Sequence, residues 1–155
     1  MSLTLSPNRL MRRLAQASLL AGACLMVPLI ARADDSYYTL QVKSRLTNLA
    51  NRMGYEVTTD PYVSLLGRET YDTVTYELEA GTTYMVMATC DEDCEDLDLE
   101  LYDADGNFLE TDDAVDPTPM ISFTPEVSGL YSVNVVMYAC SVESCYQAVD
   151  IFEVP

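Results

Sequence analysis

The sequence has 155 residues, with 25 Asp and Glu against eight Lys and Arg and no histidine. This length accommodates one domain with its own hydrophobic core. The excess of negative charge excludes binding to DNA, RNA or an anionic membrane surface. The lack of histidine leaves serine and cysteine nucleophiles without their usual base, and carboxylate pairs are too common here for any one to indicate catalysis. We therefore predict that the protein is not an enzyme.

The first 33 residues have the features of an export signal. Three arginines precede an apolar run at 14–30, which ends in a small-x-small sequence at 31–33. We expect cleavage there, a mature chain that begins at Asp34, a periplasmic or secreted location and no membrane insertion after cleavage. The lipobox-like sequence at 21–24 leaves one alternative, a lipoprotein anchored at Cys24.

Removal of this segment makes the chain more acidic. The mature chain holds four cations against 25 acids, a net charge of −21. All four cations precede Glu69, and from that residue onward there are 21 acids and no Lys, Arg or His. Solubility or adaptation to salt explains such a surface, and binding of cations is the more specific interpretation.

Residues 36–53 show the periodicity of an amphipathic helix. Val42, Leu46, Leu49 and Met53 recur at spacings of four, three and four, and Gly54 follows where a C-terminal cap is expected. We predict one short amphipathic α-helix whose apolar stripe packs on the rest of the domain. A linker follows, so that 34–68 form an N-terminal helix and linker segment.

Beyond the linker the pattern changes to period two. Apolar and polar residues alternate in short segments that are separated by turn signals. The predicted strands cover 74–78, 84–89, 97–102, 108–110, 120–123, 130–138 and 146–152, with a further strand near 62–66. This number of short strands indicates the all-β class: an antiparallel β-sandwich or jelly roll at 69–155, preceded by the single helix.

The strand at 97–102 has the clearest pattern. Three leucines alternate with charged residues, which predicts that Leu99 lies in the core and Glu100 faces solvent. Asp105-Gly106 then supplies a hairpin turn. An EF-hand calcium loop is excluded at this point, because the motif requires an acid where Leu101 stands.

Several segments, taken in order, resemble a known family. They are LEAGTTY at 78–84, DLDLELYDADG at 96–106, FTP at 123–125 and SGLYSV at 128–133. In this succession the chain resembles the bacterial pre-peptidase C-terminal domain over roughly residues 70–153. The resemblance implies a small jelly-roll-like sandwich that serves exported enzymes as a non-catalytic module for secretion, localisation or binding. The N-terminal helix and two cysteine pairs depart from that family.

Four cysteines follow the predicted cleavage point: Cys90, Cys94, Cys140 and Cys145. An even number in an exported chain predicts two disulfides. A zinc site is the alternative, but the spacings C-x3-C and C-x4-C without histidine fit zinc poorly. We expect Cys90 to pair with Cys94 and Cys140 with Cys145, as cysteines that flank hairpins; a crossed pairing, such as Cys90 with Cys145, stays open.

Reversal of the chain at each connection would bring the loops at 90–96, 112–119 and 140–145 to the same end of the sandwich. Two of these loops are densely acidic, and hard oxygen ligands on loops suit calcium. The predicted ligands are Asp91, Asp93, Glu95, Asp96, Asp112, Asp113 and Asp116. The alternative is that these acids only face water. We predict no required cofactor, and calcium as the one candidate ion.

The sequence contains 11 tyrosines, which favour strands and also stack on sugars. Those considered for a sugar-stacking face are Tyr62, Tyr71, Tyr102, Tyr138 and Tyr146.

Two functions remain for this sequence. The first is a binding or accessory module of the cell envelope or medium that recognises a protein or glycan, for which we expect a monomer. The second is a structural protein that assembles through its helix or edge strands, for which we expect a defined oligomer.

Overall fold

The computed structural model describes residues 29–155. Most of the predicted export signal, with Cys24, lies outside this range. The described residues form one helix and eight strands. In chain order these are α1 (Leu29–Met53), β1 (Tyr62–Gly67), β2 (Thr70–Leu78), β3 (Tyr84–Cys90), β4 (Cys94–Tyr102), β5 (Phe108–Asp112), β6 (Met120–Phe123), β7 (Gly129–Cys140) and β8 (Ser144–Glu153).

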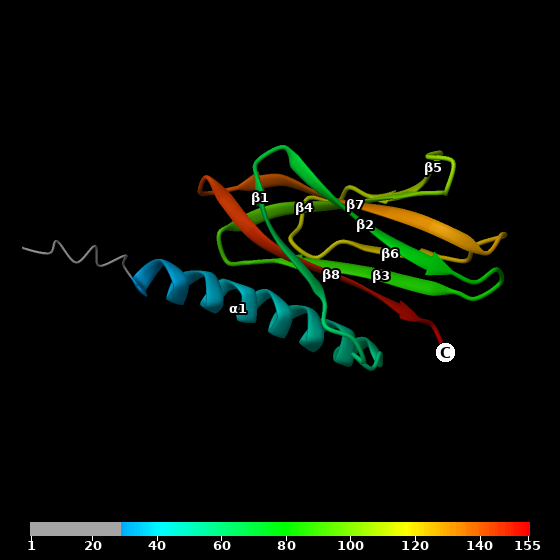
Figure 1. The fold of residues 1–155 in the computed structure, drawn as a ribbon, viewed down its shortest axis with the longest axis horizontal. Coiled ribbons are helices and arrows are strands. Elements are labelled where there is room, and N and C mark those ends of the chain that lie inside the picture. Colours follow the sequence, from blue (N-terminus) through cyan, green and yellow to red (C-terminus); the bar gives the residue numbers. More distant parts are fainter. Residues whose placement is uncertain (1–28) are drawn as a thin grey trace, which may run out of the picture.

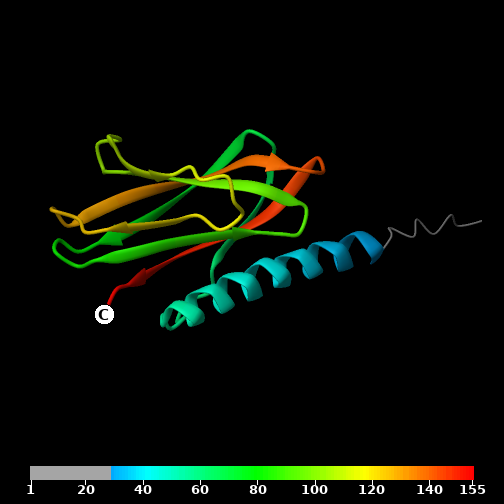
Figure 2. The ribbon, with the colours of Figure 1, turned by 180° about the vertical axis from the view of Figure 1, so that it is seen from behind.

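The strands form two four-stranded antiparallel sheets that stack face to face (Figure 1). One has the order β1-β8-β3-β6 and the other the order β2-β7-β4-β5. The helix lies along the first sheet in both views (Figures 1 and 2), so we call this sheet the covered sheet and the other the open sheet. This architecture confirms the predicted antiparallel β-sandwich with a single helix.

The core lies between the two sheets. In the open sheet, Leu97, Leu99 and Leu101 of β4 are buried together with Val133 and Val135 of β7. Strands β3, β6 and β8 of the covered sheet contribute the facing apolar side chains. The period-two alternation therefore has its predicted meaning, because the residues on one side of each strand fill the space between the sheets.

Two local features refine the prediction. The expected hairpin turn joins β4 to β5, with Gly106 at a φ of +81°. Strand β1 pairs with β8 from Tyr62↔Val149 to Gly67↔Ser144, which confirms the further strand predicted near 62–66 and adds it to the sandwich before residue 69. As an edge strand with one neighbour, β1 has mixed burial and hence a weak period-two signal.

Helix α1 packs on the covered sheet through Val42, Leu46 and Ala50, which are fully buried against side chains of β3 and β8. It ends at Met53 as predicted, and Gly54 follows in a left-handed conformation with a φ of +89°. It begins at Leu29, whereas the sequence predicted a start at residue 36. The prediction began later because only the part of the helix that contacts the sheet carries the apolar periodicity. Among residues 29–155, no helix combines the length and the apolar character needed to cross a membrane.

Candidate functional site

Both disulfides lie at one end of the sandwich, which we call the disulfide end and which comprises the connections 67–70, 90–94, 112–120 and 140–144. The bridges join Cys90 to Cys94 and Cys140 to Cys145, with Cα separations of 5.9 and 6.1 Å. The local pairing is thus the predicted one. The cysteines do not flank hairpins, however: each bridge joins a strand of one sheet to a strand of the other, β3 to β4 and β7 to β8. The two bridges therefore tie the sheets together.

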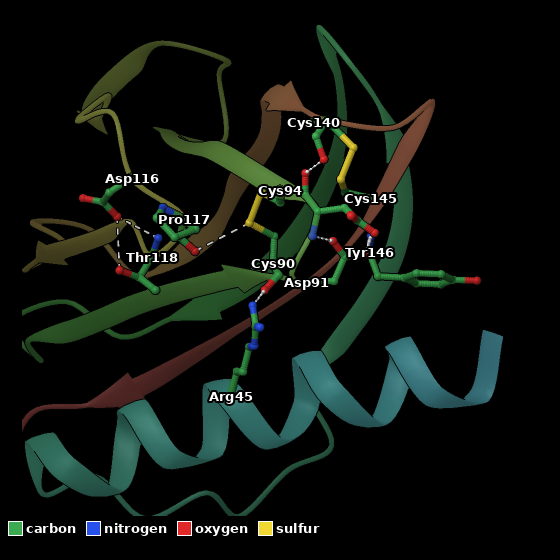
Figure 3. Close-up of a disulfide and its surroundings, with 12 residues drawn as sticks. Arg45, Cys90, Asp91, Cys94, Asp116, Pro117, Thr118, Cys140, Cys145 and Tyr146 are labelled. Atoms are coloured by element: carbon green, nitrogen blue, oxygen red, sulfur yellow. Dashed lines mark hydrogen bonds between the residues drawn. A yellow bond between two sulfur atoms is a disulfide. The ribbon is translucent and has the colours of Figure 1, made fainter. Parts of the chain in front are cut away.

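The two bridges are neighbours, because Cys94 lies opposite Cys140 in the register of β4 and β7. From α1, Arg45 donates to the carbonyl oxygen of Cys90 at 2.8 Å (Figure 3). From the β1–β2 turn, Arg68 donates to the carbonyl oxygen of Cys140 at 2.5 Å. Two of the few cationic residues, Arg45 and Arg68, thus donate hydrogen bonds to the backbone carbonyl oxygen of the first cysteine in each pair. Sequence patterns do not reveal this role, since the partners are 45 and 72 residues apart.

Asp91 and Asp93 connect two loops of the disulfide end. The Asp91 carboxylate accepts the N–H of Tyr146 at 2.6 Å and the N–H of Asp93 at 3.2 Å (Figure 3). Ser141 donates its N–H and its hydroxyl to the carbonyl oxygen of Asp93, both at 2.8 Å. Burial is the largest of the causes that raise the pKa of Asp91. These contacts confirm that the β3–β4 and β7–β8 connections share one end.

Asp112 and Asp116 organise the third acidic connection, between β5 and β6. The Asp112 carboxylate accepts the N–H of Ala114 at 3.2 Å and that of Met120 at 2.8 Å. Asp116 Oδ1 accepts the N–H of Thr118 at 2.7 Å and its hydroxyl at 3.1 Å. The carbonyl oxygen of Asp116 accepts an N–H from β4, which joins this loop to the others. Both carboxylates are therefore engaged in holding the loop backbone.

Asp96 and Asp98 of β4 each have a buried carboxylate oxygen, Oδ1, that lacks a hydrogen-bond partner. Asp96 is only 5% exposed. Burial is the largest cause that raises the pKa of Asp98 to about 6, followed by the charges of Asp96, Asp113 and Asp112. Asp98 was not among the predicted ligands, because alternation placed it on the polar side of a strand and gave no sign of the acids around it.

The seven predicted calcium ligands thus fall into separate groups. Three of them, Asp96, Asp112 and Asp113, lie around Asp98, and a fourth, Asp116, lies beside Asp96. Asp91 and Asp93 belong to the contact with the β7–β8 connection, and Glu95 is exposed near the start of β4. Among the described side chains, those of residues 36–155, no group of three or more His, Cys, Asp or Glu has a geometry that could hold a metal ion. Ion binding near Asp98 would therefore require its neighbours to move.

The outer face of the open sheet carries four hydrogen-bonded side chains, which we call the Glu100 network: Thr73, Asn134, Glu100 and Tyr102. The first three lie side by side on β2, β7 and β4. The Thr73 hydroxyl and Asn134 Oδ1 are 2.7 Å apart, with the hydroxyl as donor. Glu100 Oε2 accepts both Asn134 Nδ2 at 3.2 Å and the Tyr102 hydroxyl at 2.7 Å. Alternation placed Glu100 on the correct side, but the strand register supplies its partners.

Aromatic side chains lie beside this network. Tyr102 packs edge-on against Phe108 of β5, with ring centroids 5.8 Å apart. Phe108 is 56% exposed and Tyr71 of β2 is 63% exposed. The hydrogen bond to Glu100 is the largest cause that raises the pKa of Tyr102, and the Tyr71 hydroxyl is near enough to contribute.

Three of the five tyrosines considered for a sugar-stacking face share this outer face: Tyr71, Tyr102 and Tyr138. The other two belong to the covered sheet. Tyr62 of β1 donates its hydroxyl to Asp72 at 2.6 Å. Tyr146 of β8 stacks on Tyr38 of α1, with ring centroids 5.9 Å apart and planes inclined by 7°. The predicted set of five is therefore split between the two sheets.

Comparison with protein families found no match, and comparison with curated proteins found none. Among solved structures, the chain is similar to the pre-peptidase C-terminal domain of collagenase from Bacillus anthracis, with 13% identity and a TM-score of 0.42 over 58% of this chain and 89% of that one. It is also similar to Bacillus licheniformis lipase BlEst2 in its propeptide form, with 11% identity and a TM-score of 0.38 over 63% of this chain and 23% of the lipase. The resemblance predicted from the sequence segments is thus also found among the structural neighbours. At such identities, neither similarity transfers an activity or a partner.

Proposed function

We propose that this protein is an exported, non-catalytic binding or accessory module of the cell envelope or medium that recognises a protein or glycan. The observation that carries this proposal is the Glu100 network, where three strands hold polar groups in place beside exposed aromatic rings. Recognition surfaces combine exposed aromatic side chains with a few well-placed polar groups. Catalysis would also need an oriented nucleophile or base, and the whole sequence contains no histidine.

The two disulfides support export, since such bridges persist mainly in oxidising compartments. We propose the periplasm or the medium as the location, reached through the signal at 1–33. A lipid anchor at Cys24 is the alternative, and it would keep the same domain at a membrane surface.

We also propose that calcium stabilises the acids around Asp98. The support is the pair of buried, unpartnered oxygens, Oδ1 of Asp96 and Oδ1 of Asp98. Such oxygens are costly to bury, and a divalent cation would satisfy them. Asp112 and Asp116 would exchange their hydrogen bonds to the loop backbone for the ion, so that binding would be coupled to the conformation of the β5–β6 connection.

A structural protein that assembles through its helix is the second candidate. The N-terminal end of α1 extends past the sandwich (Figure 1). On this helix Leu40 is 67% exposed and Tyr37 is 55% exposed. Exposed apolar side chains on a projecting helix are typical of a contact with another chain.

Two double variants separate these candidates: Tyr71→Ala with Phe108→Ala on the open sheet, and Tyr37→Ala with Leu40→Ala on the helix. Binding of the exported protein to washed cell-envelope material is measured together with sedimentation velocity. A binding module should be a monomer whose binding is lost in the first variant and kept in the second. An assembly protein should be an oligomer that the second variant dissociates. A monomer that binds no envelope or secreted component would contradict both.

A further inference from the structure

We propose that the ligand of the outer face of the open sheet is a cationic segment of a partner protein, and that Glu100 receives one of its arginine or lysine side chains. This inference rests on the proposed function as a binding module and names the chemistry of the partner. The geometry of Glu100, the rings beside it and the charge of the sheet carry the argument.

Glu100 is held in one orientation by its neighbours. Both hydrogen bonds that it accepts, from Tyr102 at 2.7 Å and Asn134 at 3.2 Å, end on Oε2. Asn134 is itself oriented, because its Oδ1 accepts the Thr73 hydroxyl at 2.7 Å. Neither bond to Glu100 uses Oε1, which leaves that oxygen for an incoming donor. A carboxylate that is already ordered loses little side-chain entropy when a charged donor binds, and such charge-assisted hydrogen bonds are strong.

The rings beside Glu100 suit the same ligand. Tyr102 is fixed at both ends, by its hydrogen bond to Glu100 and by its edge-on contact with Phe108. Phe108 and Tyr71 remain more than half exposed. Guanidinium groups stack on aromatic faces, and ammonium groups bind over them, so the rings add attraction for a cation that the carboxylate anchors.

The open sheet itself carries no positive charge. Its four strands contain no Lys or Arg, and Glu77, Asp98 and Glu100 lie on the polar side of β2 and β4. A sulfated glycan or a nucleic acid would be repelled, whereas a cationic segment is attracted within about 8 to 10 Å at ordinary ionic strength. A neutral glycan would use the same rings but would gain nothing from this charge. Charge complementarity therefore favours a cationic protein segment.

A second copy of this chain is a poor source of that cation. Lys43 pairs with Asp60 at 2.6 Å, while Arg45 and Arg68 donate to backbone carbonyl oxygens. Three of the four cations of the predicted mature chain are thus engaged within the molecule. The partner should be a different protein.

The test is an NMR titration of the exported, ¹⁵N-labelled protein with an octapeptide of alternating arginine and glycine. We expect amide shifts to cluster in β2, β4 and β7 around the Glu100 network, and the affinity to fall with added salt. Glu100→Gln keeps the shape and removes the charge, and it should weaken binding about tenfold. Glu143→Gln changes an exposed acid in the β7–β8 connection and makes the same change in net charge. It should weaken binding less than about twofold.

Tyr102→Phe tests the positioning of Glu100 independently. It keeps the ring and removes the hydroxyl that orients the carboxylate, so it should weaken binding by a factor between those of the two Gln variants. The ¹⁵N spectrum of each variant reports whether it is folded, and Tyr102→Phe keeps the test decisive should Glu100→Gln unfold.

Equal weakening by Glu100→Gln and Glu143→Gln, or shifts spread over the acidic loops, would indicate general acidity and overturn the inference. Binding of neutral cellohexaose at the same amides, unchanged by Glu100→Gln, would also overturn it while leaving the binding module intact. If the peptide does not bind but the protein still binds envelope material, the inference of a cationic ligand is overturned and the binding module stands. If neither the peptide nor envelope material binds, the proposed function itself is contradicted.

Discussion

Leu99 and Glu100 are neighbours in β4 with opposite surroundings. Leu99 is fully buried between the sheets, whereas Glu100 accepts two hydrogen bonds on the outer face. We expect Leu99→Ala to lower the free energy of unfolding by about 2 to 4 kcal/mol, because it leaves a cavity. Alternation alone predicts almost no cost for Glu100→Ala, but the two hydrogen bonds raise the expected loss to about 1 kcal/mol. Denaturant unfolding measures both, and equal losses would contradict the assignment of β4.

Asp150 of β8 should make stability depend on pH. It is buried, Oδ1 accepts the N–H of Ile151 at 2.9 Å, and Oδ2 accepts the Thr59 hydroxyl at 3.0 Å. Burial is the largest of the causes that raise its pKa above the ordinary value of 3.8. The folded state therefore holds this proton more tightly than the unfolded state. The contribution of protonated Asp150 to the free energy of unfolding is complete below the unfolded-state pKa and is lost as pH rises through the folded-state pKa.

The variant Asp150→Asn isolates this group. Its amide still accepts from Ile151 and donates to the Thr59 hydroxyl oxygen, so it should melt at a higher temperature than the parent at pH 7 and at nearly the same temperature below pH 4. Asp105→Asn, in the exposed β4–β5 turn, serves as the control. A difference between Asp150→Asn and the parent that stays constant from pH 3.5 to pH 7 would rule out the titration of Asp150 as its cause.

At the scale of elements, the docking of α1 can be tested within one helix. Leu46 is fully buried against the covered sheet, whereas Leu40 is largely exposed. We expect Leu46→Ala to lower the free energy of unfolding by about 2 to 4 kcal/mol and Leu40→Ala to change it by less than about 0.5 kcal/mol. Thermal and denaturant unfolding give both values. If the two substitutions cost the same, α1 does not contribute its apolar stripe to the folded core.

The disulfides act on the connections between sheets. The exported protein should contain no alkylatable thiol from these four cysteines, and peptide mapping without reduction should recover Cys90 with Cys94 and Cys140 with Cys145. By the chain-entropy estimate, loops this short contribute about 2 kcal/mol each. Cys94 lies opposite Cys140, so these two residues are close enough to consider as an alternative pair. Recovery of a disulfide-linked peptide that joins them would contradict the local pairing.

For the molecule as a whole, most acids lack a cationic partner. Among the side chains of residues 36–155, the one salt bridge joins Lys43 to Asp60 at 2.6 Å. If calcium binds around Asp98, an ion concentration a hundredfold above its dissociation constant adds about 2.7 kcal/mol. For a domain of this size the melting temperature should rise by about 3 to 6 °C.

This melt is measured at fixed ionic strength. Asp96→Asn should abolish the rise and Asp105→Asn should keep it, since both remove one charge but only the first removes a carboxylate with a buried, unpartnered oxygen. A rise no larger than that produced by magnesium, or by sodium chloride of matched ionic strength, would show that the acids only face solvent.

Features that repeat along the chain could be predicted from it. The leucines of β4 marked the core side of a strand, and the stripe that contains Val42 and Leu46 marked the buried side of α1. The end of the helix at Met53 was predicted from one residue, Gly54, which stands where a C-terminal cap is expected. The helix start at Leu29 escaped prediction, because it lies away from the sheet, whereas β1 was predicted near 62–66 although it is a sandwich edge with a weak period-two signal.

The sequence alone determined the fold class, the strand positions and the acidic character, because burial and charge leave periodic or compositional signals. Only the tertiary structure decided which side chains meet. Glu100 and Asn134 are 34 residues apart, and Arg45 reaches the carbonyl oxygen of Cys90 from a different element. The acids around Asp98 likewise come from β4 and the β5–β6 connection. Such contacts depend on the order of strands in a sheet and on their register, and neither leaves a repeating pattern in a single chain.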